Sequence, residues 1–345
     1  MKTIVVIGAG LAGVRCVETL RAEGFDGRVV LVGEESHPPY ERPALSKEFL
    51  AGARDDIALR HASHYDELGI ELVLDARVES VLGGTASAGD QAWEFDALVL
   101  ATGARPRHLA GPRSSRVHHL RTLDDARSLR ERLRPGRRLV VVGSGFVGAE
   151  VATTAARLGV DVTVVEAGSS PLGGLMGDEV GSVLETAYHR CGIELRLGAS
   201  VKRIEPRSVF LEDGTRLAHD VVLVAIGVEP SCELQADGAL VAGDATGSGH
   251  WTAAAEQGVA AARRLLGMPL GAPQPPFVWS DQLGLRLQVI GRTRPAAVVE
   301  LDGDERSFVA RYLDSDGTVL GAVAANRPTA TAELRLELAA VASAA

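Results

Sequence analysis

The feature that most constrains this chain is a glycine pattern, G-x-G-x-x-G, that occurs twice. One copy occupies residues 8–13 after the apolar run 3–7, and the other occupies residues 143–148 after the apolar run 139–142. Each copy predicts a strand, a tight turn and a helix. The first glycine permits the turn, the second lets the backbone approach a pyrophosphate, and the third lets helix and strand pack closely. Two copies in this context predict that the protein holds two dinucleotides and transfers electrons between them.

An acidic residue ends the second strand after each glycine pattern. Glu34 follows the stretch 28–33, and Glu166 follows the stretch 161–165. A carboxylate at this place accepts hydrogen bonds from ribose hydroxyls. Either residue alone would fit an exposed loop glutamate equally well, and its pairing with a glycine pattern favours ribose binding. Glu166 would also repel a 2′-phosphate, so the second site is expected to prefer NADH to NADPH.

Composition narrows the class of protein. A chain of 345 residues is long enough for two or three domains, and a formal net charge of −9 argues against nucleic-acid binding. No stretch approaches the roughly 18 apolar residues of a membrane span, and the apolar start is interpreted as a first strand rather than a signal peptide. The three cysteines lie far apart in the sequence, which predicts no disulfide and fits a reducing cytoplasm.

The chain is organised as an internal repeat followed by a smaller third part. Two βαβ units at 3–33 and 138–166 each lead through short hairpins to a buried apolar strand. The expected elements beyond these units are helices at 63–68, 178–191, 252–266 and from 331, and strands at 70–74, 97–100, 193–197, 208–211, 216–217, 221–226, 285–290, 296–300, 308–313 and 319–323. They predict an α/β protein with two Rossmann-like dinucleotide-binding domains and, after a proline-rich linker at 269–276, a small C-terminal α+β domain.

An ordered series of further motifs runs through nearly the whole chain. It comprises Tyr-Glu-Arg-Pro-Ala-Leu-Ser-Lys at 40–47, Ala-Thr-Gly at 101–103, Leu-Arg-Thr at 120–122, Gly-Asp at 243–244, Glu-Gln-Gly at 256–258, Trp-Ser-Asp-Gln at 279–282 and Asn-Arg-Pro at 326–328. With the two glycine patterns, this series resembles the ferredoxin reductases of oxygenase systems, which are FAD-dependent members of the pyridine nucleotide-disulfide oxidoreductase superfamily with a glutathione reductase-like fold. The resemblance implies an FAD-binding domain at 1–107 and 234–270, an NAD-binding domain at 108–233, and a C-terminal α+β domain at 271–345.

The resemblance also implies which residues bind the cofactors. Those expected to contact FAD are Gly8, Gly10, Leu11, Ala12, Gly13, Glu34, Arg42, Lys47, Val78, Ala101, Thr102, Gly103, Arg121, Gly243, Asp244 and Trp251. Those expected to contact NADH are Gly143, Gly145, Phe146, Val147, Gly148, Glu166 and Gly227. Lys47 and Glu150 are expected to form a catalytic ion pair beside flavin N5, where an ammonium stabilises the negative charge that a hydride adds. Trp279 fits either interdomain packing or a place near the flavin, and no metal site is expected.

The implied activity is that of an NADH:ferredoxin reductase, which passes electrons from NADH through FAD to a [2Fe-2S] ferredoxin serving an oxygenase or a cytochrome P450. Because ferredoxins are generally acidic, a basic docking surface is expected to aid the encounter. The candidates for it, which would fit a solvated surface equally well, are Arg286, Arg292, Arg294 and Arg311. Two alternatives are an NADH-dependent reductase of small acceptors, such as free flavin or quinone, and an NADH-responsive flavoprotein with little turnover. The chain is expected to be a monomer or a homodimer.

The sequence departs from the family pattern in several places. Segment 40–47 contains no cysteine, so thiol–disulfide chemistry beside the flavin is not expected. The segments before Gly243 and between Asp244 and Trp251 are short, which puts the electron acceptor in question more than the cofactor. Gly-Gly at 173–174 stands where the family often has an arginine, so a modest affinity for NADH is expected.

Overall fold

The computed structural model describes residues 1–109, 114–272, 274–294 and 298–344, with side chains up to 340. The chain divides into two compact units. The first unit comprises Met1–Arg42, Asp56–Arg105 and Val228–Ala272, and the second comprises Pro43–Asp55, Pro106–Gly227 and Pro273–Ala345. Parts of the expected linker at 269–276 and of the expected strand at 296–300 lie outside the described residues.

The first unit is built around a five-stranded parallel sheet in the order β18-β7-β1-β2-β3. Its strands are β1 (Thr3–Ile7), β2 (Arg28–Val32), β3 (Ile70–Val73), β7 (Ala97–Leu100) and β18 (Leu240–Val241). The Val, Ile and Leu residues of β1, β2 and β7 are buried on both faces, as in other parallel sheets covered on both sides. Because β1 lies between β2 and β7, the strand order reverses beside the first glycine turn, where open α/β sheets bind nucleotides.

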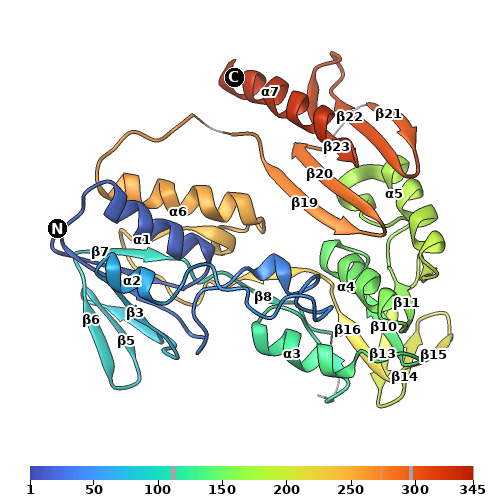
Figure 1. Ribbon diagram of the computed structural model, residues 1–345, viewed down its shortest axis with the longest axis horizontal. Helices are drawn as coiled ribbons and strands as arrows, with labels where there is room; N and C mark the ends of the chain where they lie inside the picture. Colours follow the sequence, from blue (N-terminus) through green and yellow to red (C-terminus); the bar gives the residue numbers. More distant parts are fainter. Residues whose placement is uncertain (110–113, 273, 295–297, 345) are drawn as a thin grey trace. The chain divides into compact units, whose positions relative to one another are not determined.

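Two helices lie side by side on one face of this sheet, α1 (Leu11–Ala22) and α6 (Trp251–Leu265) (Figure 1). Their close approach requires Gly258, where a Cβ atom would lie 2.2 Å from the backbone oxygen of Ala12. The other face packs against a small antiparallel sheet that buries Trp93. The remaining elements here are β4 (Ser80–Leu82), β5 (Thr85–Ala88), β6 (Gln91–Glu94), α2 (Ser63–Glu67), η2 (Gly243–Thr246), and the paired strands β8 (Ala104–Pro106) and β17 (Val228–Pro230). The short helix η1 (Arg42–Ala44) begins at the last residue of the first segment of this unit and continues into the second unit.

The second unit repeats the motif with a parallel sheet in the order β12-β11-β10-β16-β9. Its strands are β9 (Val117–His118), β10 (Arg138–Val142), β11 (Asp161–Val165), β12 (Glu194–Arg196) and β16 (Val221–Val224), and its helices are α3 (Leu123–Arg132), α4 (Phe146–Arg157) and α5 (Gly173–Arg190). A separate antiparallel sheet holds β13 (Val201–Glu205), β14 (Ser208–Leu211) and β15 (Arg216–Ala218), which confirms the predicted hairpin. Gly177 has a φ of +84°, so regular helix within α5 begins at Asp178, as the sequence predicts.

The C-terminal part of the second unit is an antiparallel sheet in the order β19-β20-β23-β22-β21 with α7 packed against one face (Figure 1). Its elements are β19 (Phe277–Gln282), β20 (Leu285–Gly291), β21 (Val298–Asp304), β22 (Ser307–Leu313), β23 (Val319–Ala325) and α7 (Pro328–Ala344). Strand β19 was not expected, because Trp-Ser-Asp-Gln lacks the apolar alternation of a strand. It is held by pairing with β20 in full register, from Phe277 opposite Ile290 to Gln282 opposite Leu285.

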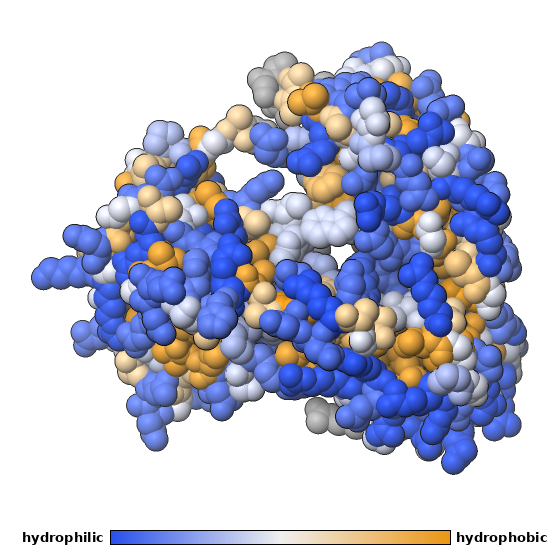
Figure 2. Space-filling view, viewed as in Figure 1, coloured by the Kyte–Doolittle hydropathy of each residue, from blue (hydrophilic) through white to orange (hydrophobic). Residues whose placement is uncertain are grey.

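On the face shown in Figure 2, hydrophilic residues predominate and hydrophobic residues occur in small groups, as on most folded proteins. Within the described ranges, no helix is both long enough and apolar enough to cross a membrane. The side chains of Cys16, Cys191 and Cys232 are free thiols.

Candidate nucleotide-binding and redox site

The first glycine turn connects β1 to α1, and its three glycines meet different surroundings. A Cβ atom at Gly8 would lie 2.0 Å from the carbonyl oxygen of Ala101, and one at Gly13 would lie 2.0 Å from the carbonyl oxygen of Gly8. These two glycines are therefore required by the packing of the protein itself. A Cβ atom at Gly10 would have no heavy atom within 4 Å, and the φ of Gly10, −83°, is one that any residue adopts. Neither packing nor backbone conformation explains the glycine at position 10.

The second glycine turn, between β10 and α4, repeats this division. A Cβ atom at Gly143 would lie 2.5 Å from the carbonyl oxygen of Ala225, and one at Gly148 would lie 2.1 Å from that of Gly143. A Cβ atom at Gly145 would again meet open space, and its φ is −66°. Gly10 and Gly145 precede the first turns of α1 and α4, whose N–H groups are directed toward the same space. Each turn therefore has room for a pyrophosphate group close to the backbone.

Glu166 follows β11 and is tied to the second glycine turn. Its Oε2 accepts the backbone N–H of Ser144 at 2.8 Å and the Ser144 hydroxyl at 2.7 Å, while its Oε1 accepts the backbone N–H of Gly168 at 2.8 Å. Burial alone would raise the pKa of Glu166, but these hydrogen bonds outweigh burial and lower it below its usual value. Glu166 is therefore an ionised hydrogen-bond acceptor beside the second glycine turn, in the place where a ribose hydroxyl would be bound.

Glu34 follows β2 in the first unit and has a different environment. It is largely exposed and accepts a hydrogen bond from Arg77 at 2.7 Å. The next residue, Glu35, is half-buried and accepts hydrogen bonds from Tyr40 at 2.6 Å and from Arg42 at 2.7 Å. Burial alone would lower the pKa of Arg42, but the charges of Tyr40, Glu35 and Asp244 outweigh burial and raise it, so Arg42 stays a cation. The sequence did not predict the partners Arg77 and Glu35.

Lys47 and Glu150 form the ion pair that the sequence predicts. Lys47 Nζ lies 2.7 Å from Glu150 Oε2, and the exposed fractions of the two side chains are 13% and 6%. The Lys47 ammonium also donates to the carbonyl oxygen of Pro43 at 3.1 Å. Among the described residues these are its two partners, so one of its three N–H groups is left for a further acceptor. A buried ion pair is by itself weak evidence for a stabilising role.

Two serines complete the surroundings of Glu150. The Ser46 hydroxyl donates to Glu150 Oε2 at 2.5 Å, and the Ser280 hydroxyl donates to Glu150 Oε1 at 2.6 Å. Ser280 lies on β19, is fully buried, and accepts a hydrogen bond from Gln282 Nε2 at 3.0 Å. Sequence reasoning missed both serines, although each lies inside a quoted motif, because a hydroxyl that contacts a residue more than 100 positions away leaves no local pattern.

Other residues expected to bind FAD occupy several parts of the chain. The hydroxyl of Thr102 donates to the carbonyl oxygen of Ser231 at 2.8 Å, and Gly243, with a φ of +73°, donates its N–H to the Gln257 side chain at 2.8 Å. Val78 is buried, and Trp251 begins α6. The backbone N–H groups of residues 121 and 122 are capped by the carboxylate of Asp125 at the start of α3.

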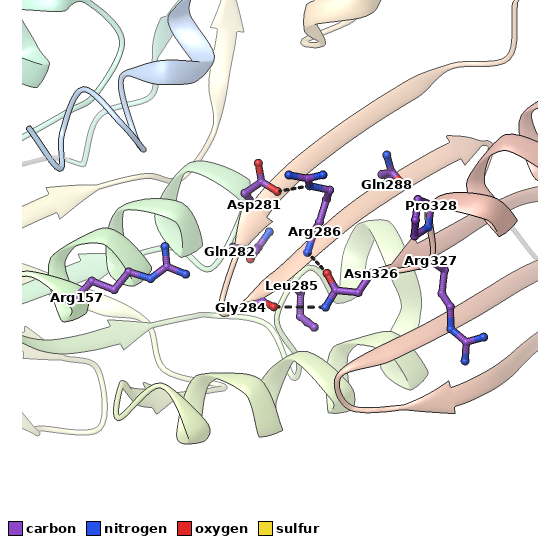
Figure 3. Close-up of a pocket in the computed structure, with 10 residues that line it drawn as sticks. All are labelled: Arg157, Asp281, Gln282, Gly284, Leu285, Arg286, Gln288, Asn326, Arg327 and Pro328. Atoms are coloured by element: carbon purple, nitrogen blue, oxygen red, sulfur yellow. Dashed lines mark hydrogen bonds and ion pairs between the residues drawn. The ribbon is translucent and has the colours of Figure 1, made fainter. Parts of the chain in front are cut away.

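A pocket of about 470 Å³ lies along the hairpin of β19 and β20. Figure 3 shows Asp281 and Arg286 directed toward each other across this hairpin, with Arg157 reaching from the end of α4. The distance from Arg286 Nε to Asp281 Oδ1 is 3.3 Å, and Arg311 pairs with Glu337 at 3.1 Å. Two of the four arginines expected to form a basic surface therefore have their charges partly balanced.

The cysteines lie apart from the Lys47 segment. Cys16 is buried within α1, and burial raises the pKa of its thiol to about 12, so the thiolate form is disfavoured. None of the three cysteines lies in segment 40–47, which carries Lys47. The described residues also contain no group of three or more His, Cys, Asp and Glu side chains placed to hold a metal ion.

Comparison with known proteins places this geometry in a family. The model of the pyridine nucleotide-disulphide oxidoreductase family matches residues 2–258, and the reductase C-terminal model matches residues 277–345. The chain is 36% identical to the biphenyl dioxygenase system ferredoxin–NAD(+) reductase component of Paraburkholderia xenovorans (strain LB400), with 94% of this chain and 90% of that protein covered. It is 35% identical to the p-cumate 2,3-dioxygenase system ferredoxin–NAD(+) reductase component of Pseudomonas putida, with 95% and 91% covered.

Solved structures give the same result. The covalent putidaredoxin reductase–putidaredoxin complex matches with a TM-score of 0.92 and 29% identity over 98% of this chain and 93% of that chain. The structure of Fdr9 matches with a TM-score of 0.90 and 31% identity over 99% and 95%. The predicted fold class is thereby confirmed, including the third, C-terminal part. The chain belongs to the pyridine nucleotide-disulphide oxidoreductase family, among the members that carry the reductase C-terminal domain.

Proposed function

We propose that this protein is an NADH:ferredoxin reductase that binds FAD at the first glycine turn and NADH at the second. The observation that carries this proposal is the pair of glycines, Gly10 and Gly145, that neither packing nor backbone conformation requires. A ligand that must approach the backbone within van der Waals distance explains both. The relatives named above are reductase components of dioxygenase systems, which supports the same assignment.

The residues proposed to hold FAD are those already named for the first glycine turn, together with Glu34, Arg42, Thr102, Gly243 and Asp244. We assign residues 1–107 and 234–270 to the FAD-binding domain, 108–233 to the NAD-binding domain, and 271–345 to the C-terminal domain. The chemistry that FAD supplies when bound is acceptance of a hydride from NADH and release of single electrons to an iron–sulfur protein.

In this proposal, the remaining N–H group of Lys47 would donate to the bound flavin. Glu150 fixes the ammonium through the 2.7 Å ion pair, and the carbonyl oxygen of Pro43 accepts a hydrogen bond from a second N–H group. The Lys47 ammonium would then lie beside the part of the flavin on which negative charge develops during hydride transfer. Water is largely excluded there, and an oriented charge stabilises a transition state most in such surroundings. Glu166 supplies a ribose acceptor that disfavours a 2′-phosphate, so NADH is the proposed electron donor.

The proposed partner is a [2Fe-2S] ferredoxin, and the proposed location is the cytoplasm. The similar solved complex joins putidaredoxin reductase to putidaredoxin, and the free thiols of this chain fit a reducing compartment. The two ion pairs Asp281–Arg286 and Arg311–Glu337 balance two of the arginine charges of the third part locally. Docking is therefore expected to depend on individual arginines, such as Arg292, rather than on a strongly basic face.

The test measures electron transfer from NADH to two kinds of acceptor with the purified FAD-loaded protein. With a [2Fe-2S] ferredoxin and cytochrome c as the final acceptor, the rate of cytochrome reduction should rise with ferredoxin concentration and fall as salt is added. A fast rate with free flavin or quinone and no gain from any ferredoxin would instead identify a reductase of small acceptors. Flavin that NADH reduces without onward transfer to any acceptor would identify a binding protein.

A further inference from the structure

We propose that Ser280, on the first strand of the C-terminal sheet, is a positioning residue for the Lys47–Glu150 ion pair. This inference rests on the proposed function, in which that ion pair serves the flavin. It assigns the C-terminal part of the chain a role in hydride transfer from NADH, in addition to any role in binding a ferredoxin.

The direction of the hydrogen bonds follows from the donors present. Gln282 Nε2 donates to Ser280 Oγ at 3.0 Å, so this oxygen already acts as an acceptor. Ser280 has one hydroxyl proton, and Glu150 Oε1 lies 2.6 Å away. A carboxylate oxygen accepts, so the proton of Ser280 is directed at Glu150. Gln282 thereby orients Ser280, and Ser280 in turn fixes one oxygen of Glu150.

The two oxygens of Glu150 have separate partners. Oε2 receives the Lys47 ammonium and the Ser46 hydroxyl, whereas Ser280 is the donor to Oε1 within the part of the chain that the structure describes. Glu150 is 5% exposed and Ser280 is fully buried, so little water is available to replace a lost donor. Removing the Ser280 hydroxyl therefore leaves Oε1 unsatisfied and frees the carboxylate to rotate away from Lys47.

Strand β19 is anchored to α4 close to this contact. The backbone N–H of Leu283 donates to the Thr153 hydroxyl at 2.9 Å, and that hydroxyl donates to the carbonyl oxygen of Ala149 at 2.7 Å. Leu283 is fully buried with a φ of +56°, a conformation that a leucine keeps only where its surroundings impose it. The turn after β19 thus fixes the register of this strand against α4. In that register Ser280 contacts Glu150, which lies one helical turn before Thr153.

The composition of the chain offers a direct probe of Lys47. Lys2, Lys47 and Lys202 are its three lysines, so protein labelled with ¹⁵N at the lysine side chain gives at most three ammonium signals. The Lys47 ammonium is largely buried and hydrogen-bonded, and its protons should exchange slowly with water, while Lys202 is 56% exposed and should exchange fast. This signal can be recorded without FAD, and it reports the ion pair itself.

The decisive variant is Ser280→Ala, with Ser280→Cys as a second variant that nearly keeps the side-chain volume but offers only a weak S–H donor. We expect Ser280→Ala to raise the exchange rate of the Lys47 ammonium roughly tenfold in the FAD-free protein. In the FAD-loaded protein, we expect the limiting rate of reduction by NADH to fall roughly tenfold at an unchanged half-saturating NADH concentration. Ser280→Cys should show the same changes at smaller size.

The matched control is Thr331→Val, which removes another buried hydroxyl of the C-terminal part, one that donates to Gln288 at 2.5 Å and does not contact Glu150. It should leave both readouts unchanged. A folded Ser280→Ala protein with the exchange rate and reduction rate of the unaltered chain would overturn the inference. If Ser280→Ala does not fold, the same result with Ser280→Cys overturns it. An unaltered protein that never binds FAD would refute the proposed function, and the Lys47 signal would still test the contact.

Discussion

Ser144 donates both its hydroxyl and its backbone N–H to one oxygen of Glu166, at 2.7 Å and 2.8 Å. This contact joins the second glycine turn, which is proposed to hold a pyrophosphate, to the residue proposed to hold the adenosine ribose. The other oxygen of Glu166 accepts the backbone N–H of Gly168, and Ala167 supplies a further backbone hydrogen bond to the carboxylate.

The first prediction is that Glu166 sets the choice of nicotinamide nucleotide. Glu166→Ala should lower the preference for NADH over NADPH by roughly tenfold or more, because a charged acceptor for the ribose and the repulsion of a 2′-phosphate are lost together. The measurement is the ratio of kcat/KM for the two nucleotides. Ser144→Ala keeps the Glu166 carboxylate and should retain the preference for NADH. An unchanged ratio in Glu166→Ala would remove the role assigned to this residue.

The second prediction concerns stability in acid. The pKa of Glu166 is lowered in the folded protein, so its ionised form contributes stability above the pKa of an unfolded glutamate. That contribution is lost as the pH falls toward the lowered value. Glu166→Gln should therefore reduce the difference in unfolding free energy between about pH 7 and about pH 4, measured by urea denaturation. Glu94→Gln, at an exposed glutamate of β6, serves as the control. Equal pH dependence in both variants would contradict the prediction.

The third prediction separates glycines required by ligands from glycines required by packing. Gly10→Ala should change the free energy of unfolding of the FAD-free protein by no more than about 1 kcal/mol and should strongly weaken FAD binding. Gly145→Ala should spare FAD and weaken NADH binding. Gly13→Ala places its methyl group 2.0 Å from a backbone oxygen and should destabilise the fold by roughly 1–3 kcal/mol or more. Titration calorimetry measures nucleotide binding by the three variants, and urea denaturation measures their free energy of unfolding. Normal FAD binding by Gly10→Ala would argue against the first turn as the FAD site.

The fourth prediction is that Lys47 governs the rate at which NADH reduces the flavin. Lys47→Met should keep bound FAD while the rate of flavin reduction by NADH falls by roughly 10² to 10³, the loss typical for one oriented group that stabilises developing charge. Lys202→Met replaces an exposed lysine of β13, and its reduction rate should equal that of the unaltered chain. The rate is measured by rapid mixing without oxygen. If NADH reduces the flavin of both variants at the same rate, Lys47 has no catalytic role.

The elements that the sequence predicted well are those with local patterns. The apolar runs before Gly8 and Gly143 are strands β1 and β10, and a helix follows each as predicted, beginning at Leu11 and Phe146 inside the glycine pattern rather than after it. Helix–strand alternation and glycine turns depend on neighbouring residues, so one sequence suffices to find them. The Lys47–Glu150 pair was placed by resemblance, and the scarcity of lysine, three among 36 basic residues, is an additional signal for Lys47.

The parts that could not be predicted depend on contacts between distant residues. Ser46 and Ser280 reach Glu150 across 104 and 130 positions, and no local pattern marks either hydroxyl. Strand β19 owes its conformation to its pairing with β20 and not to its own side chains. The ion pair of Glu34 with Arg77 likewise joins two loops that the sequence does not relate.

The measurement that tests the central claim most directly is rapid mixing of the purified, FAD-reconstituted protein with NADH in the absence of oxygen, followed by its visible absorption. We predict that NADH bleaches the flavin absorption rapidly and that NADPH does so much more slowly. A protein that takes up no FAD, or one whose flavin absorption NADH leaves unchanged, would contradict the assignment of two dinucleotide sites that exchange electrons.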